Sequence, residues 1–543
     1  MRGYITAKQE FLYPDTELGV MLSELELVSA QNGKIGIQVL FQCFDECGKV
    51  CIEGEGFQTE YFQLIDIPVE YNTGDGIEQE GAMVISPPKC PDYAIRQAPF
   101  RVYDCLRPMP DGVISSVNKR VAVYICLSPE EGILAGKYKL CMRVIADGTE
   151  HICNINVQVF SVSIDENRFQ QTNWFSLESL ELCHGVQPGT QEYFDMVRSY
   201  ARAMRRIHQR IICLPMSIGP NSQFKEPPYY FDFEHLKPII KLFFEEGFDT
   251  LEAMGLLTCG NLPDGKPDIY TDVLKCVVNP EIPVDSDKGF EILNCMMRDY
   301  AAFLRRNNWQ HKVLMHIYDE PDDRFASEVQ MQAKRMQYFM TANIVRKHLP
   351  TVKIIEAVKT TLFRGAIDIL VPLTNGYQKE KKAFDTAAAV GDEIWTYVCC
   401  VPEGFWLNRF LDQPLVNGRL IFWGCAANHI KGLLHWGFNM FSAGVPNPFM
   451  ATSCHNHTGA GTNFPCGDAF IVYPGENGPW LSMRMEANRR GAEDAALLDA
   501  LYHKNPKTHE ELVSKVFKGF DQYDNDPERM ELVFKELLER LAD

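Results

Sequence analysis

The chain has 543 residues, of which 46% are hydrophobic and 23% charged, a balance that excludes a largely disordered protein. Acidic residues outnumber basic ones by 72 to 53, giving a net charge of −19, and the densest basic run, at 202–210, is expected to be the solvated face of a helix. We therefore expect neither nucleic acid nor an anionic membrane as a partner.

The opening residues, MRGYITAKQE, lack the apolar segment of an export signal, and no later stretch approaches 18 uninterrupted apolar residues. We therefore expect a cytoplasmic protein without a membrane span. Its 18 cysteines are expected to be reduced thiols, because a chain of this length does not need disulfides to hold a core.

The first part of the chain, residues 1–166, is rich in runs typical of β-strands with turn residues between them. Little of it shows the spacing of an amphipathic helix. Many strands with few helices predict a β-sandwich domain. The clearest expected strands are residues 34–44, 120–128, 137–148 and 151–164.

From residue 167 to 505, apolar runs alternate with amphipathic segments. The expected strands are 172–176, 210–215, 248–257, 312–320, 352–358, 366–373, 393–400 and 432–438. The expected helices are 190–208, 233–246, 287–307, 326–348, 378–390, 419–430 and 482–503.

Strands that are apolar throughout, rather than alternating, are typical of a parallel sheet covered on both faces. Eight of them with helices between predict a (β/α)₈ TIM-type barrel over 167–505, so the fold class is α/β with an N-terminal β-sandwich. An open doubly wound sheet is the alternative. Residues 506–543 are expected to be a helical tail packed on the barrel.

The fourth expected strand ends in two adjacent acids, Asp319 and Glu320, followed by Pro321. The carboxyl ends of barrel strands are where active sites lie. Because successive strand residues point to opposite faces, both acids reach one substrate only if the chain turns near Glu320. Two close carboxyls would then differ in pKa, one able to donate a proton and the other staying charged, as glycosidase chemistry requires. The alternative is an exposed pair that forms salt bridges or caps a helix.

Aromatic and amide side chains also gather near the expected strand ends. Aromatic rings stack on the apolar faces of sugars while polar groups bind the hydroxyls, so this grouping favours a carbohydrate site. His316, three residues before Asp319, is expected to be a core histidine with a backbone partner. The candidate sugar contacts are Trp174, Asn375, Tyr377, Tyr397, Trp436 and Asn439.

The motif IYDEP at 317–321 resembles the catalytic motif of glycoside hydrolase family 123, the β-N-acetylgalactosaminidases. Later segments resemble that family in the same order, and the resemblance covers roughly residues 120–501. In the segment after NWF (173–175), Ser176 and Glu178 stand where the family pattern has a His and an Asp. The later segments are DILVPL (368–373), WTYVC (395–399), KGLLHWGFNMF (431–441), GDAFIVYPG (467–475) and SMRMEANRRGAEDAALLDAL (482–501).

The resemblance implies a retaining hydrolase that removes terminal β-linked N-acetylgalactosamine by substrate-assisted catalysis. Glu320 would be the general acid, and Asp319 would hold the 2-acetamido group, whose oxygen attacks the anomeric carbon. The substrate would be a small 2-acetamido oligosaccharide, and the reaction would use no metal or organic cofactor.

Three other interpretations stay open. The loop 447–466 carries Cys454, His455, His457 and Cys466, residue types that bind zinc, although their spacing fits no standard finger. Another interpretation is a two-carboxylate glycosidase in which Glu356 or Glu403 is the nucleophile. The last is a carbohydrate-binding protein without catalysis.

Overall fold

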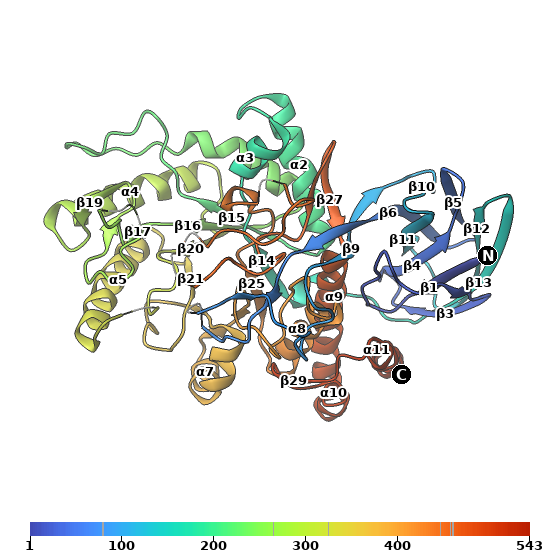
Figure 1. The fold of residues 1–543 in the computed structure, drawn as a ribbon. Helices are drawn as coiled ribbons and strands as arrows, with labels where there is room; N and C mark the ends of the chain where they lie inside the picture. The colour runs from blue at the N-terminus through green and yellow to red at the C-terminus, as the bar shows by residue number, and fades with distance from the viewer. Residues whose placement is uncertain are drawn as a thin grey trace.

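The computed structural model of the chain describes residues 1–78, 81–263, 265, 267–323, 325–445, 447–456, 458 and 461–543. They form a mixed α/β structure, in which the sheets of the N-terminal part stand beside parallel strands surrounded by helices (Figure 1). Within these residues, no helix is both long and apolar enough to cross a membrane.

Two large sheets make up most of the N-terminal part. Strands β3 and β13, both in the smaller of them, pair in parallel. In sheet order, the larger contains β2 (Gly19–Val20), β1 (Arg2–Thr6), β4 (Ile35–Gln42), β11 (Arg120–Pro129), β6 (Phe57–Val69), β9 (Phe100–Pro108), β27 (Gly478–Ser482) and β26 (Tyr473–Gly475). The smaller contains β10 (Val113–Ser115), β5 (Cys47–Glu53), β12 (Gly136–Ala146), β13 (Thr149–Val159) and β3 (Glu24–Ser29).

An apolar cluster lies between these two sheets and holds them together. It includes Ile37 and Val39 from β4 and Ile155 and Val157 from β13. Along β13, every second residue from Cys153 onward is buried, the period of a strand with one face in a core. Each of the four segments expected to be strands in this part contains one.

The C-terminal segment β26–β27 extends the N-terminal sheet. Leu481 pairs with Leu106, and Ser482 pairs with Cys105, in antiparallel register. This pairing joins residues far apart in the chain, so the boundaries predicted at 166 and 505 separate parts that share a sheet. The boundaries themselves stay a prediction.

Parallel strands follow from residue 170, and each of the eight segments expected to be strands contains one or two. One sheet has the order β15 (Ile211–Pro215), β16 (Thr250–Met254), β20 (Val313–His316), β21 (Lys353–Ala357), β22 (Ile369–Val371) and β23 (Glu393–Ile394). A second has the order β14 (Gln170–Asn173), β25 (Gly432–His435) and β24 (Thr396–Tyr397).

Hydrogen bonds link these two parallel sheets at both ends. Leu373, just after β22, forms a parallel bridge with Tyr397 of β24. At the other end, the Gln209 side chain donates to the carbonyls of Asn173 and Ile211 at 3.0 and 2.8 Å and accepts from the Asn173 N–H at 3.0 Å. A buried amide therefore substitutes for backbone pairing between β14 and β15.

Helices lie between the strands, and those expected from the sequence are found within a few residues of their predicted ends. Ser286, Ser327 and Ser482 begin three of them as N-caps, each accepting a backbone N–H in the first turn. The helices are α1 (Glu178–His184), α2 (Gln191–Arg206), α3 (Lys237–Glu245), α4 (Asp287–Arg306), α5 (Glu328–His348), α6 (Thr374–Lys379), α7 (Lys381–Ala389), α8 (Val416–Ala427), α9 (Met483–Lys504), α10 (Pro506–Val513) and α11 (Pro527–Ala542).

The excursion after β16 was not expected. The sequence predicts the next helix at 287–307, where α4 stands, and assigns no element to the residues between, where β17–β19 lie; residues 267 and 269 within the excursion line a cavity described below. The remaining short elements are β7 (Asn72–Thr73), β8 (Val84–Ile85), β17 (Leu257–Thr258), β18 (Lys275–Cys276), β19 (Asn279–Pro283), β28 (Phe517–Gly519), β29 (Gln522–Tyr523), η1 (Glu166–Arg168), η2 (Glu234–Leu236) and η3 (Phe441–Ala443).

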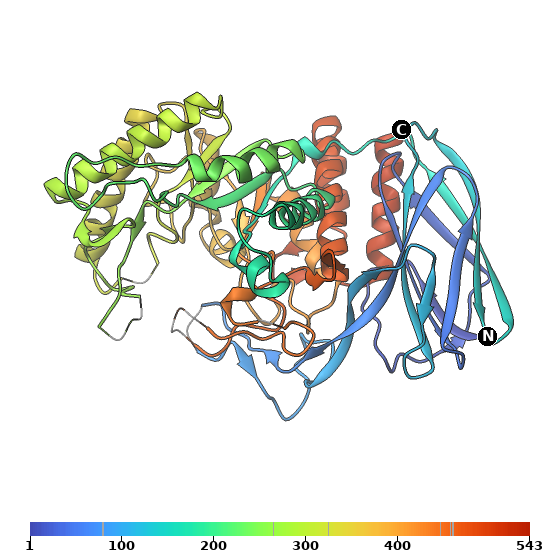
Figure 2. The ribbon, with the colours of Figure 1, turned by 90° about the horizontal axis from the view of Figure 1, so that it is seen from above.

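Helix α9 is buried along most of its length and stands with α11 between the N-terminal sheets and the parallel strands, as the two red helices of Figure 2 show. Its charged residues are paired rather than exposed. Arg419 of α8, which is fully buried, donates to Asp494 of α9 at 2.5 Å and to Glu531 of α11 at 2.7 Å. This ion-pair cluster joins three helices, including the tail helix α11.

Removing the shared cation should destabilise this junction strongly, because the buried Asp494 carboxylate would lose its ion-pair partner, while Glu531 keeps Arg490. We expect Arg419→Met, which preserves most of the volume, to lower the free energy of unfolding by about 3–5 kcal/mol. Chemical denaturation followed by circular dichroism measures it. Glu539→Gln, which breaks the exposed α11 pair with Lys535, is the matched control and should change stability by less than about 0.5 kcal/mol. Equal effects of the two variants would contradict the expectation.

Candidate active site

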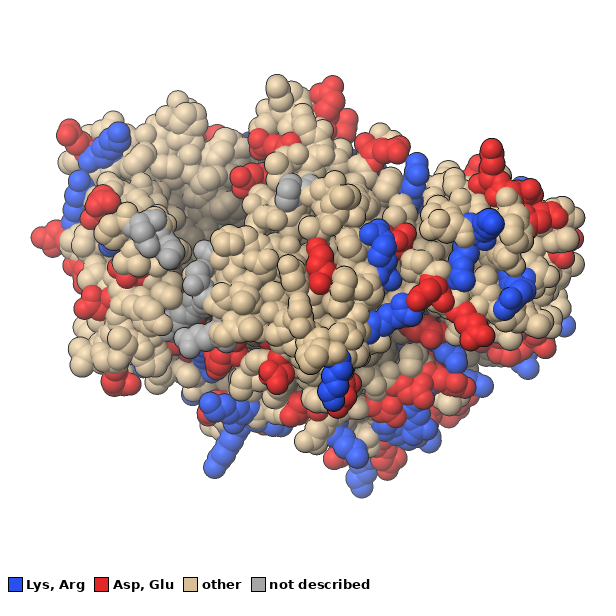
Figure 3. All heavy atoms as spheres, in the orientation of Figure 1, with Lys and Arg blue, Asp and Glu red and all other residues tan. Residues whose placement is uncertain are grey.

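A cavity of about 310 Å³ opens at the carboxyl ends of the parallel strands. In Figure 3 this face is hollowed left of centre, over the region where Figure 1 places β16 and β20, and few charged side chains surround the hollow. The cavity is lined by Trp174, Pro267, Ile269, Tyr318, Asp319, Glu320, Asp323, Ala357, Tyr397, Cys399, Cys400, Leu434, Trp436, Thr458 and Phe464.

Asp319 and Glu320 both line this cavity, because the backbone turns at Glu320. The φ angle of Glu320 is +50°, in the left-handed region that L-residues other than glycine seldom adopt. The Glu320 carbonyl then accepts the Asp323 N–H at 3.0 Å, closing a turn around Pro321. The turn expected from the sequence is therefore present, and it brings two neighbouring side chains to one space.

Glu320 is arranged to hold a proton at neutral pH. Burial raises its pKa to about 8, and the negative charges of Asp319 and Asp323 add to the shift. A hydrogen bond donated by the Tyr397 hydroxyl and the positive charge of Lys359 act in the opposite direction but do not cancel it. A carboxyl with such a pKa can donate a proton in water at pH 7.

Asp319 is more exposed than Glu320, with 44% of its side chain accessible. The buried His316 lies next to it. His316 Nε2 lies 3.5 Å from Asp319 Oδ1 and 2.6 Å from Glu356 Oε1, while Nδ1 lies 3.2 Å from Glu252 Oε1. Burial alone would lower the pKa of His316, but these three carboxylates raise it well above its usual value. The prediction of a core histidine with a backbone partner was wrong about the partners.

Two tryptophans line the cavity, each oriented by a buried carboxylate. The Trp174 indole donates to Glu252 at 3.2 Å, and the Trp436 indole donates to Asp468 at 3.1 Å. His435 Nε2 also lies 3.4 Å from Asp468. The hydrogen bonds of the indole N–H groups fix the positions of both rings in the cavity wall.

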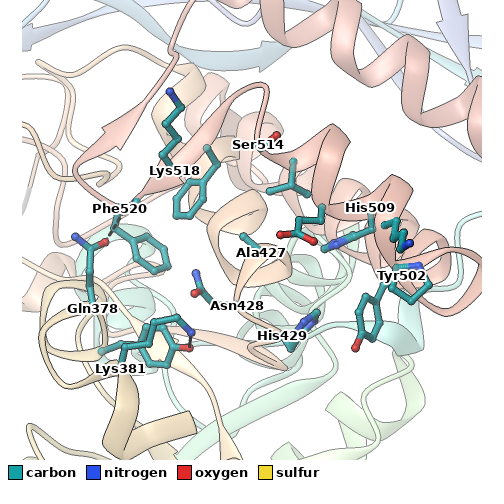
Figure 4. Close-up of a pocket in the computed structure, with 17 residues that line it drawn as sticks. Gln378, Lys381, Ala427, Asn428, His429, Tyr502, His509, Ser514, Lys518 and Phe520 are labelled. Carbon is teal, nitrogen blue, oxygen red and sulfur yellow. Dashed lines mark hydrogen bonds between the residues drawn. The ribbon is translucent and has the colours of Figure 1, made fainter.

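Three of the predicted sugar contacts lie elsewhere. The Asn375 side chain donates to the Ile77 carbonyl at 3.0 Å. Tyr377 is buried, donates to Asp385 at 2.8 Å, and lines a different cavity beside α10, shown with Gln378 and Lys381 in Figure 4. These two residues follow β22 within helix α6, which carries them away from the site.

Asn439, the third, is fully buried and has a structural role. Its amide accepts the Ser176 N–H at 2.8 Å and donates to the Ser176 carbonyl at 3.0 Å, so it ties the segment after β25 to the segment after β14. We therefore withdraw Asn375, Tyr377 and Asn439 as sugar contacts.

The two carboxylates considered as an alternative nucleophile are buried behind or beside the cavity. Glu356 accepts the Tyr338 hydroxyl at 2.5 Å and contacts His316, and neither of its oxygens is free. Glu403 accepts the Gly76 N–H at 3.1 Å, and burial raises its pKa to about 9.

The loop considered for zinc is only partly described, because His457 lies outside the described residues. Cys454 and Cys466 are buried, and the Cys466 thiol donates to Glu70 at 3.2 Å. Among the side chains that the structure describes, no group of three His, Cys, Asp or Glu residues is arranged to hold a metal ion.

Sequence reasoning missed Glu252, and it named His316 only as a core histidine and Glu356 only as an alternative nucleophile, so the cluster that the three form was not predicted. Glu252 and Glu356 stand within the apolar runs TLEAM and KIIEA, where a charged residue is buried and needs a partner. Three such residues on neighbouring strands were a signal that their side chains meet. The residues at 267 and 269 gave no comparable signal, since they lie in an unpredicted excursion.

Comparison with known proteins agrees with this geometry. The family model of the glycoside hydrolase 123 catalytic domain matches residues 174–501. A search of curated proteins gave no match. Among solved structures, a family 123 glycoside hydrolase from Clostridium perfringens, described in work on glycolipid glycan hydrolysis, superposes with a TM-score of 0.70 at 13% identity, covering 99% of this chain and 98% of that one. At this identity the likeness shows the fold alone.

A β-galactosidase from the psychrophilic Marinomonas ef1 has a TM-score of 0.35 at 12% identity, over 64% of this chain and 62% of that one. This score is too low to indicate a shared fold. The family model alone spans more than half of the chain, and it includes both acids and both tryptophans of the cavity. The chain belongs to glycoside hydrolase family 123 and is a glycoside hydrolase.

Proposed function

We propose that this enzyme removes terminal β-linked N-acetylgalactosamine, with retention, by substrate-assisted catalysis. The observation that carries the proposal is the sharing of one cavity by Asp319 and Glu320, in which burial raises the pKa of Glu320 to about 8. Neighbouring residues of one turn approach a bound sugar from one strand end, whereas the acid and nucleophile of a two-carboxylate retaining enzyme flank the glycosidic bond from opposite sides, about 5–5.5 Å apart. A nucleophile supplied by the substrate removes that requirement.

For the fold we infer a (β/α)₈ barrel preceded by a β-sandwich, with the domains at 1–166, 167–505 and 506–543. In support, the parallel strands follow the order β14, β15, β16, β20, β21, β22, β23–β24 and β25, and β25 pairs with β14. The Gln209 bridge closes the remaining gap. The acids then stand at the carboxyl ends of the barrel strands, where the chemistry of such barrels takes place.

In the proposed reaction, Glu320 donates its proton to the glycosidic oxygen as the bond to the anomeric carbon breaks. Asp319 accepts a hydrogen bond from the N–H of the 2-acetamido group and stabilises the positive charge that develops on it. The acetamido oxygen attacks the anomeric carbon from the opposite face and forms an oxazolinium ion. Glu320, now ionised, takes a proton from the water that opens this ring, so its own proton is restored.

The walls of the cavity fit a sugar ring. Trp174 and Trp436 come from the first and last strands, and Tyr397 reaches across to Glu320. We propose that the indole faces stack on the apolar side of the ring and that the Tyr397 hydroxyl positions the Glu320 carboxyl. Glu356 is occupied by buried partners, and Glu403 accepts the Gly76 N–H and does not line the cavity, so neither residue is supported as a protein nucleophile.

A substrate panel tests the mechanism. The enzyme should hydrolyse 4-nitrophenyl β-N-acetylgalactosaminide and should hydrolyse the matching β-galactoside at least about 10³-fold more slowly, because the galactoside has no acetamido nucleophile. The β-N-acetylglucosaminide tests the configuration at C4. Equal rates on the N-acetylgalactosaminide and the galactoside would remove substrate assistance.

Replacement of the general acid should depend on the leaving group. We expect Glu320→Gln to lower kcat/KM on the 4-nitrophenyl substrate by about 10²–10⁴-fold, because proton transfer to the leaving oxygen is lost. With a 2,4-dinitrophenyl leaving group, which needs little protonation, the loss should be much smaller. Glu403→Gln is the control: it removes another buried, protonated carboxyl away from the cavity and should keep the wild-type rate. A loss that is the same for both leaving groups would reject Glu320 as the acid.

The rate should also follow the protonation of Glu320. Its pKa of about 8 predicts that kcat/KM is level near neutral pH and falls about tenfold per pH unit well above 8, as the proton needed by the leaving group is lost. The measurement is kcat/KM between pH 5 and 10 with the 4-nitrophenyl substrate. A decline that begins near pH 5 would show that the raised pKa is absent from the working enzyme.

A further inference from the structure

His316 ends strand β20 three residues before Asp319, and it is completely buried. Both of its ring nitrogens face carboxylate oxygens: Nδ1 faces Glu252 at 3.2 Å, and Nε2 faces Glu356 at 2.6 Å and Asp319 at 3.5 Å. A neutral imidazole donates through one nitrogen only and would turn a lone pair towards a carboxylate at the other. The Nδ1 contact has the geometry of a hydrogen bond, and Nε2 lies within ion-pair distance of two carboxylates, so the arrangement fits an imidazolium cation with carboxylates on both sides.

Both glutamates accept hydrogen bonds from groups other than His316. Glu252 accepts the Thr172 hydroxyl at 2.8 Å and the Trp174 indole at 3.2 Å. Hydrogen bonds donated to a carboxylate favour its charged form.

Glu356 has three donors besides His316. The backbone N–H groups of Ile317 and Tyr318 each lie 3.1 Å from its Oε2, and the Tyr338 hydroxyl lies at 2.5 Å. The groups that face His316 thus come from β16, from β21 and from its own chain after β20, and the Trp174 ring of the β14 end packs on it edge-on at 5.3 Å. Three carboxylates and the Trp174 ring therefore surround His316. Of these carboxylates, that of Asp319 lines the cavity.

We propose that His316 is a positioning residue whose positive charge keeps Asp319 ionised, so that the single proton of the Asp319–Glu320 pair resides on Glu320. This rests on the proposed function, in which one acid donates a proton and the other stays charged. Two adjacent carboxyls in one cavity share a proton, and a fixed cation on one side decides which of them carries it. His316 itself touches neither substrate nor the reacting bond.

The different protonation states of Asp319 and Glu320 affect each step of the proposed reaction. With Asp319 charged, it accepts the acetamido N–H and stabilises the oxazolinium cation, and its charge keeps Glu320 protonated for leaving-group departure. Without the cation, the proton moves partly to Asp319, so the general acid and the amide acceptor are both weakened. No oxidant, metal or further reactant takes part.

The first test is the pH dependence of His316→Gln, a variant that keeps hydrogen-bonding capacity but carries no charge. We expect kcat/KM to fall by about 10²-fold at pH 7. The acidic limb of the profile should move to higher pH, because Asp319 ionises later, and the alkaline limb to lower pH, because Glu320 loses its proton sooner. The loss should persist with a 2,4-dinitrophenyl leaving group, as expected of a residue that acts through Asp319.

His509→Gln is the matched control. His509 is also a buried histidine, 4% exposed, but it lies in α10 beside the remote cavity of Figure 4, where burial lowers its pKa to about 4. This variant should keep the wild-type pH profile. Circular dichroism and the denaturation midpoint of both variants show whether each is folded.

The second test does not depend on activity. In ¹⁵N-histidine-labelled wild-type enzyme, the His316 resonances, assigned by their disappearance in His316→Gln, should report an imidazolium from pH 6 to above pH 8. The spectrum is recorded without substrate, so it decides the charge of His316 even if no 2-acetamido glycoside is cleaved, which would reject the proposed function instead. A neutral His316 at pH 7, or a variant slowed equally at every pH with both limbs unmoved, would overturn the inference.

Discussion

The backbone turn at Glu320 is the constraint on which the site depends. A strand presents successive side chains to opposite faces, so an uninterrupted β20 would direct only one of the two acids into the cavity. The left-handed conformation of Glu320, followed by Pro321, redirects the chain so that both acids line the same space. Such a conformation is costly for a residue with a side chain, and it persists because the Glu320 carbonyl is bonded to Asp323 and its carboxyl to Tyr397.

Bringing two acids together creates an electrostatic problem, which the surroundings resolve unequally. Glu320 is in the more buried position, which raises its pKa to about 8, whereas Asp319 is more exposed and lies against His316. Burial strengthens the interactions between these charged groups, because the local dielectric is low. Buried carboxylates, Glu252 and Asp468, orient the two tryptophans. Burial also makes the environment of Glu320 differ from that of Asp319.

Much of the fold could be predicted from the sequence, since its signals are local. The parallel strands were found where apolar runs alternate with amphipathic segments, and the antiparallel strands where strand-type runs alternate with turn residues. The acids, Trp174, Trp436 and Tyr397 could be placed at strand ends because they directly end or follow apolar runs. Asn375 and Tyr377 could not, because a short helix begins at Thr374, and sequence position gives no sign of the direction in which the chain leaves the strand.

The charged residues inside the strands show why the rest could not be predicted. His316, Glu252 and Glu356 are each isolated in the sequence, and each on its own resembles an unfavourable charge in a core. Only the parallel register of β16, β20 and β21, which pairs Met254 with His316 and Met315 with Ile354, brings the three to one point. Each of these three charged residues would be unfavourable alone in the core. Long-range strand pairing brings them together, so that they compensate one another's charge next to Asp319. The acidic dipeptide can be read from five consecutive residues, whereas the environment that would differentiate its two acids exists only once distant strands have paired.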